Sequence, residues 1–82
     1  MKIIELEIKN QRIWLVIELL RVYSPDFKAF TPTGRYICYF KLTEPTQFIL
    51  GELFKDKRNI PIMFNSEEQA KEYAENYLKD KL

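Results

Sequence analysis

The chain has 82 residues, 46% of them hydrophobic and 15% aromatic, and its thirteen basic and twelve acidic side chains give a net charge of +1. This length accommodates one domain, residues 1–82, and the apolar content excludes a disordered chain. The near-zero net charge gives no general electrostatic reason to expect nucleic acid or a membrane surface as the partner.

Two strands joined by a tight turn are predicted for the first part of the chain. Residues 2–9 alternate between apolar and charged side chains, which is the pattern of a half-buried strand. The polar residues 10–11 suit the turn. Residues 12–23 are apolar on nearly both faces, so a buried helix is an alternative, but their β-branched and aromatic content favours a strand. Such a strand would be central, with both faces covered.

A loop and a third strand are predicted next. Residues 24–34 contain two prolines and end in glycine, which is typical of a loop. Phe27 and Phe30 lie within it, and they either fold back over the core as a lid or are exposed as anchors for a partner. Residues 35–43 alternate again and predict the third strand.

The segment after the third strand is compatible with two structures. Residues 47–54 suit a short helix or a fourth strand. The strand is favoured because the charged turn at 55–59 and the apolar run at 60–64 would complete a hairpin with it. Pro61 has no N–H group, so the last of these segments is expected at an edge of the sheet or paired on one side only.

The C-terminal part carries the clearest helix signal. Ser66 and Gln69 have capping-box spacing, in which the Ser66 hydroxyl accepts the Gln69 N–H and the Gln69 side chain accepts the Ser66 N–H. The apolar stripe that follows consists of Ala70, Tyr73, Ala74, Tyr77 and Leu78. The whole pattern predicts an α+β fold, an antiparallel β-meander of about four to five strands with one C-terminal amphipathic helix packed on the sheet. The helix stripe is expected to cover the even-numbered face of the first strand.

The sequence offers few groups for catalysis or metal binding. It has no histidine and one cysteine, Cys38, so the commonest general base and an intrachain disulfide are excluded, and a reducing, cytoplasmic location is expected. We see no signal-peptide or membrane-spanning pattern.

Cys38 lies on the apolar face of a predicted strand and is expected to be buried and inert. Glu18 interrupts an apolar segment and is expected to form a salt bridge with Arg21, Arg35 or Lys41. We therefore expect neither an enzyme nor a metal- or cofactor-binding protein.

A basic and aromatic strand face gives one functional hypothesis. Arg35, Tyr39 and Lys41 alternate on one face of the third predicted strand, and Lys57 and Arg58 lie in the charged turn. Single-stranded nucleic acid is held in this way, with bases stacked on rings and phosphates paired with cations. Binding of single-stranded nucleic acid is therefore the alternative function.

The leading hypothesis is a small non-enzymatic protein-interaction domain. Twelve aromatic residues are more than so small an interior needs, and such residues are enriched at the centres of protein interfaces. Trp14, Phe27 and Phe30 are the candidate interaction residues. The small size of the chain and its lack of recognisable catalytic groups suggest an adaptor or inhibitor of the kind that phages and mobile elements encode. The expected partner is another protein, with the chain itself a homodimer, and no membrane partner is expected.

Overall fold

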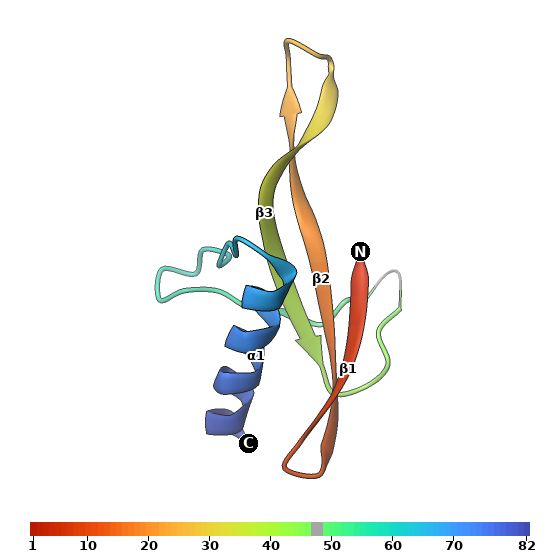
Figure 1. Cartoon of the computed structure of the whole chain (residues 1–82), viewed down its shortest axis with the longest axis vertical. Helices are drawn as coiled ribbons and strands as arrows, with labels where there is room; N and C mark the ends of the chain where they lie inside the picture. The colour runs from red at the N-terminus through yellow and green to blue at the C-terminus, as the bar shows by residue number, and fades with distance from the viewer. Residues whose placement is uncertain (47–48) are drawn as a thin grey trace.

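The computed structural model of the protein describes residues 1–46 and 49–82. Its elements in chain order are β1 (Lys2–Ile8), β2 (Gln11–Ser24), β3 (Ala29–Lys41), β4 (Glu52–Leu53) and α1 (Glu67–Lys81). The four strands form one antiparallel sheet in the order β1-β2-β3-β4, and α1 packs on one face of it (Figure 1). The predicted α+β meander with a C-terminal helix is therefore confirmed, as is the central position of the second strand.

The first turn lies one residue earlier than predicted. Ile8 pairs with Gln11, so Lys9 and Asn10 are the two turn residues, with φ angles of 51° and 66°. Two successive positive φ angles match the twist of the flanking strands, and Asn10 tolerates that conformation well. The register that results places Leu6 opposite Ile13, so that the apolar faces of β1 and β2 coincide. Gln11 is therefore the first residue of β2 although it is polar, because this register is the one that aligns the apolar faces.

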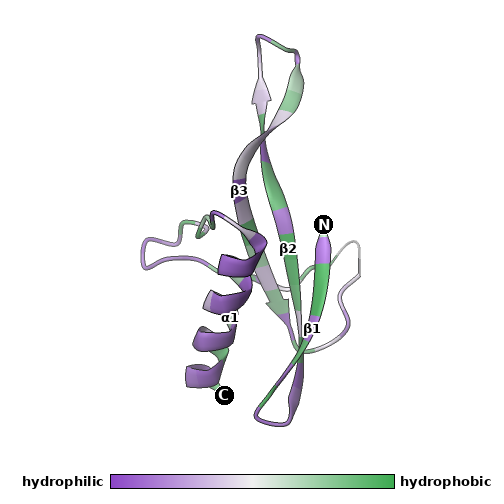
Figure 2. Ribbon diagram, viewed as in Figure 1, coloured by the Kyte–Doolittle hydropathy of each residue, from purple (hydrophilic) through white to green (hydrophobic). Residues whose placement is uncertain are grey.

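The hydrophobic core lies between α1 and the sheet face formed by the odd-numbered residues of β2. Its buried members are Ile8, Ile13, Leu15, Ile17, Cys38, Phe54, Phe64, Ala70, Ala74 and Leu78. Ile4 and Leu6 of β1 pack against this cluster, so the helix stripe covers the even-numbered face of the first strand as expected. In Figure 2, β2 is mostly hydrophobic and the visible side of α1 is mostly hydrophilic, which is the division that an amphipathic helix on a sheet requires.

The other face of β2 is also covered. The chain crosses behind the sheet on its way to β4, on the side away from α1 (Figure 1). Val16 faces that side and is fully buried, and Leu50, just before β4, is half-buried. Gly51 has a φ of +111°, and a Cβ atom there would overlap the Phe40 carbonyl oxygen of β3. Only glycine allows the chain to come this close to the neighbouring backbone.

The helix begins with a capping arrangement that differs in one bond from the prediction. The Ser66 hydroxyl accepts the Gln69 backbone N–H at 3.0 Å, as expected. The Gln69 side-chain oxygen, however, accepts the N–H of Asn65 at 2.6 Å instead of that of Ser66. The extended conformation of Ser66 (φ −153°, ψ 162°) brings the preceding peptide within reach of the Gln69 side chain. The cap therefore also fixes the chain one residue before the helix.

The segment between β3 and α1 contains less regular strand than expected. Residues 47 and 48 of the predicted fourth strand lie outside the described residues, and Glu52–Leu53 is the part that forms β4. The turn after it is held by the Asp56 carboxylate, which accepts the N–H groups of Arg58 and Ile60. Residues 60–64 make isolated pairs, Lys55 with Pro61 and Tyr36 with Phe64, and no regular fifth strand. Pro61 cannot donate a bond to a ladder, which limits this segment to such pairs.

The prediction of a loop at residues 24–34 is wrong. Strands β2 and β3 continue beyond the helix as a two-stranded arm, residues 20–34, and residues 25–28 alone make the turn at its tip (Figure 1). Pro32 is tolerated in β3 because this part of the strand pairs with β2 on one side only. The arm makes the molecule elongated, with principal extents of 48 × 26 × 21 Å.

A bulge with two extra residues on β3 separates the arm from the body of the sheet. Leu19 pairs with Tyr36 and Arg21 with Pro32, so Leu20 on β2 faces residues 33–35 on β3. The Thr33 hydroxyl donates to the Leu20 carbonyl oxygen at 2.9 Å, and Gly34 has a φ of +77°. Two extra residues on one strand bend the ribbon and increase its twist. The bulge therefore sets the direction in which the arm leaves the body.

Candidate protein-interaction site

The arm exposes three aromatic side chains, which we call the arm rings: Tyr23, Phe27 and Phe30. Their exposed fractions are 55%, 75% and 69%. Tyr23 and Phe30 are paired across the two strands, with their ring centroids 5.6 Å apart in an edge-to-face arrangement. Phe27 lies in the turn at the tip. Of the two alternatives for Phe27 and Phe30, the lid over the core is therefore excluded, because both rings are exposed to solvent.

The helix does not reach the arm. On β2 the odd-numbered residues face α1, and alternation places Tyr23 on the continuation of that face. Helix α1 starts beside the Tyr36–Phe64 pair, which lies on the body side of the bulge. The core face of the sheet therefore extends beyond the element that covers it, and Figure 1 shows the arm standing free of α1.

Charged side chains surround the arm rings. Arg21 pairs with Pro32 on the same face as Tyr23, two residues nearer the body, while Asp26 and Lys28 flank Phe27 at the tip. All three charged side chains are exposed, and none of them is in an ion pair with another described residue. An apolar centre with a charged rim is the usual composition of a protein interface.

Trp14 lies apart from the arm rings. It is half-buried on the face of β2 that points away from α1, opposite Glu5 of β1 and Lys41 of β3. The structure therefore brings Phe27 and Phe30 together on the arm and places the third predicted interaction residue on the body.

The residues of the nucleic-acid hypothesis are distributed over three places. Tyr39 and Lys41 are half-buried on the same face of β3, where Tyr39 lies between Val16 and Leu53. Burial raises the pKa of the Tyr39 phenol, with a further contribution from the Glu18 carboxylate.

The other three cations of that hypothesis lie elsewhere. Arg35 donates a hydrogen bond to the side-chain oxygen of Asn65, just before the helix. Lys57 and Arg58 are exposed in the separate turn that Asp56 holds. The structure therefore shows one aromatic residue and one cation on a shared face, and three cations away from it.

Two titratable residues of the sheet have contrasting surroundings. Cys38 is fully buried in the core, as predicted, and burial raises the pKa of its thiol to about 12. A thiol with so high a pKa is a poor nucleophile.

Glu18 is half-exposed, and the described residues contain no cation within ion-pair distance of it, so the predicted salt bridge is not formed. Partial access to water removes the need for a partner.

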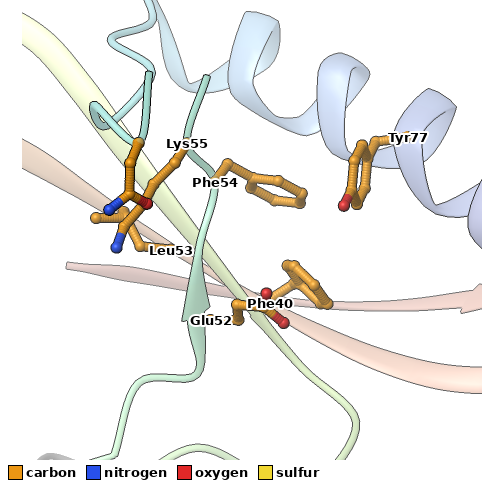
Figure 3. A pocket seen from close by; sticks show the side chains of 7 residues that line it. Phe40, Glu52, Leu53, Phe54, Lys55 and Tyr77 are labelled. Carbon is orange, nitrogen blue, oxygen red and sulfur yellow. The ribbon is translucent and has the colours of Figure 1, made fainter. Parts of the chain in front are cut away.

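A cleft of about 250 Å³ lies between β4, the 55–59 turn and the second half of α1 (Figure 3). Its apolar wall consists of Phe40, Phe54 and Tyr77, whose rings pack on one another, with centroids 4.8 Å apart for Phe40 and Phe54 and 5.2 Å apart for Phe54 and Tyr77. These spacings leave no room for a ligand between the rings. Glu52 and Lys55 add one charge of each sign to the rim. The cleft is thus the edge of the core and has no preference for one charge.

Val22 and Tyr23 are interaction candidates that sequence reasoning missed. Val22 is 50% exposed on the arm, and Tyr23 forms half of the exposed ring pair. The sequence contains a signal for this ribbon, because a four-residue turn at 25–28, which begins with Pro25 and Asp26, lets residues 21–24 and 29–32 pair with Tyr23 opposite Phe30.

Comparisons with known proteins give no relative. No protein-family model, no curated protein and no solved structure matches the chain. Among residues 1–46 and 49–82, no three potential metal ligands of the histidine, cysteine or carboxylate type lie together. The described part of the chain also contains no helix long and apolar enough to cross a membrane.

Proposed function

We propose that this protein is a small non-enzymatic interaction domain that docks on a protein partner through its arm. The observation that supports this function best is the exposure of the arm rings, at 55–75%, on a ribbon that extends beyond the helix. Exposed aromatic side chains on a protruding element supply the large contact area and the few degrees of freedom that binding centres need. This function requires no catalytic group, and an adaptor or an inhibitor acts in this way.

The physical argument rests on what the arm rings do for the fold. A side chain that is largely exposed contributes little to folding stability, because it leaves water only partly. A two-stranded ribbon outside the body is itself only marginally stable in water. The arm rings therefore add little to the isolated fold, whereas in a complex their burial would contribute to affinity.

The proposal is tested by capture from a lysate of the source organism after chemical crosslinking. The bait is the tagged protein, in comparison with the double variant Phe27→Ser, Phe30→Ser and with Ile60→Ser as the matched control. Ile60 is an exposed apolar residue that directly follows the 55–59 turn, and this segment of the chain lies away from the arm (Figure 1). We expect the same protein to be enriched by the wild type and by the control and to be lost with the double variant. Equal enrichment by all three baits would contradict docking through the arm.

A further inference from the structure

We propose that the partner of the arm is the arm of a second copy of this chain, placed antiparallel to it with the Tyr23–Phe30 pair at the two-fold axis. This inference rests on the proposed function and specifies the partner. It follows from the size of the exposed surface, from the position of the charges along the arm and from the symmetry that these positions allow.

The size of the surface favours a partner that follows the arm along its length. The exposed fractions of the three arm rings together equal about two whole ring side chains, or roughly 300–500 Å². A stable protein interface buries roughly 800 Å² on each partner. A flat partner in contact with the rings alone falls short of this area. A second arm laid along the first also covers the stems of Arg21 and Lys28, and its tip reaches the base of the first arm, where Leu19 is half-buried.

Two of the three charged side chains of the arm, Arg21 and Asp26, are complementary under a two-fold rotation, and the third, Lys28, adds a positive charge at the tip. Arg21 precedes Tyr23 by two residues toward the body, and Asp26 follows Tyr23 by three residues in the tip. The two opposite charges therefore flank the ring pair at similar spacings. When a copy is rotated by 180° about an axis through the Tyr23–Phe30 pair, its Asp26 comes opposite Arg21 of the first copy. The same contact then occurs twice, as in an isologous interface.

The resulting interface has an aromatic centre and a charged rim. Four rings, Tyr23 and Phe30 of each copy, lie in the middle, with one Arg21–Asp26 contact on each side. This is the arrangement in which buried aromatic anchors supply affinity and peripheral charges supply register. Phe27 of each copy then reaches beyond Arg21 of the other toward the end of the core face near α1.

The test uses charge reversal in the full chain. Sedimentation velocity over a range of concentrations should show the wild type and the Ile60→Ser control as dimers. Arg21→Glu and Asp26→Arg should each weaken dimerisation at least about tenfold, because both contacts become repulsive. A 1:1 mixture of these two variants should restore the dimer, since each mixed pair has two attractive contacts. Urea unfolding of the single variants checks that these exposed positions leave the fold intact.

The outcomes separate the inference from the proposed function. A wild type that stays monomeric at high concentration, or a mixture that stays as monomeric as its components, overturns arm-to-arm pairing. If capture of another protein still depends on Phe27 and Phe30 in that case, docking through the arm stands and its partner is a different protein. If the double variant Phe27→Ser, Phe30→Ser changes neither sedimentation nor capture, both proposals fail.

Discussion

Gly51 packs directly against the Phe40 carbonyl oxygen of the neighbouring strand, so a side chain at position 51 would overlap the β3 backbone. We expect Gly51→Ala to lower the free energy of unfolding by at least about 2 kcal/mol, because the new Cβ atom meets backbone and the φ of +111° is unfavourable for alanine. Urea unfolding measures this change.

Gly34→Ala is the matched control for Gly51→Ala. Gly34 also has a positive φ, but no atom lies within 4 Å of an added Cβ. The cost there should be about 1 kcal/mol, since it comes from the backbone conformation alone. Equal costs at the two positions would show that the contact with Phe40 does not matter.

The first turn holds a lysine in an unfavourable conformation. Lys9 has a φ of 51°, which asparagine adopts more readily than lysine. We expect Lys9→Asn to raise the urea midpoint by an amount equivalent to about 0.5 kcal/mol, with an unchanged slope. Lys9→Ala removes the same charge without the conformational benefit and should give no gain. A gain with alanine equal to that with asparagine would assign the effect to charge.

The start of α1 depends on the bond between the Ser66 hydroxyl and the Gln69 N–H. Ser66→Ala should lower the free energy of unfolding by about 1 kcal/mol, because a donor at the helix start loses its partner. Ser66→Asp should retain most of this stability, since the aspartate side chain also accepts the bond. Thermal unfolding followed by circular dichroism distinguishes the two variants, and equal melting temperatures for them would contradict the role of the hydroxyl.

Burial of Cys38 predicts a loss of stability at alkaline pH. Its thiol has a pKa of about 12 in the fold, against 9.0 for an ordinary thiol. Above pH 9 the unfolded chain loses this proton while the folded chain keeps it, so the unfolded state binds fewer protons and stability falls as pH rises toward 12. Cys38→Ala should lessen this decline in unfolding experiments above pH 9. An unchanged pH dependence in the variant would assign the decline to other groups.

The rings of the arm and of the core should differ sharply in their effect on folding. Phe30→Ser should change the free energy of unfolding by less than about 1 kcal/mol, because the ring is exposed and its aromatic partner, Tyr23, is exposed too. Phe54→Ala should cost about 3–5 kcal/mol, because that ring is buried against Phe40 and Tyr77. Urea unfolding tests both. Similar losses would mean that the arm ring supports the fold.

The elements that the sequence predicts well are those with a local physical cause. Alternation identifies β1 because one face must be apolar, and the Ser66–Gln69 spacing identifies the start of α1 because the unpaired N–H groups there need acceptors. Both signals lie within a few residues of the element that they describe.

The sequence does not predict the arm, because two prolines and a glycine within residues 24–34 are typical of a loop. Pro32 is compatible with a strand that pairs on one side, and Gly34 belongs to a bulge within the ribbon. Neither condition can be recognised until the pairing of β2 with β3 is known. The separation of Trp14 from Phe27 and Phe30 likewise depends on how far β2 extends past the helix, which no local pattern records.

Because the arm extends from the bulge opposite Leu20, a small change of angle at the bulge produces a large displacement at the tip. Five strand residues and a turn carry Phe27 roughly 20 Å past this point, at about 3.3 Å for each residue. A change of ten degrees in the bend of the ribbon at Gly34 would therefore move the tip by roughly 3–4 Å, about the rise of one strand residue. Sequence changes at positions 33–35 can thus change the direction of the arm rings relative to the body while every ring residue stays the same.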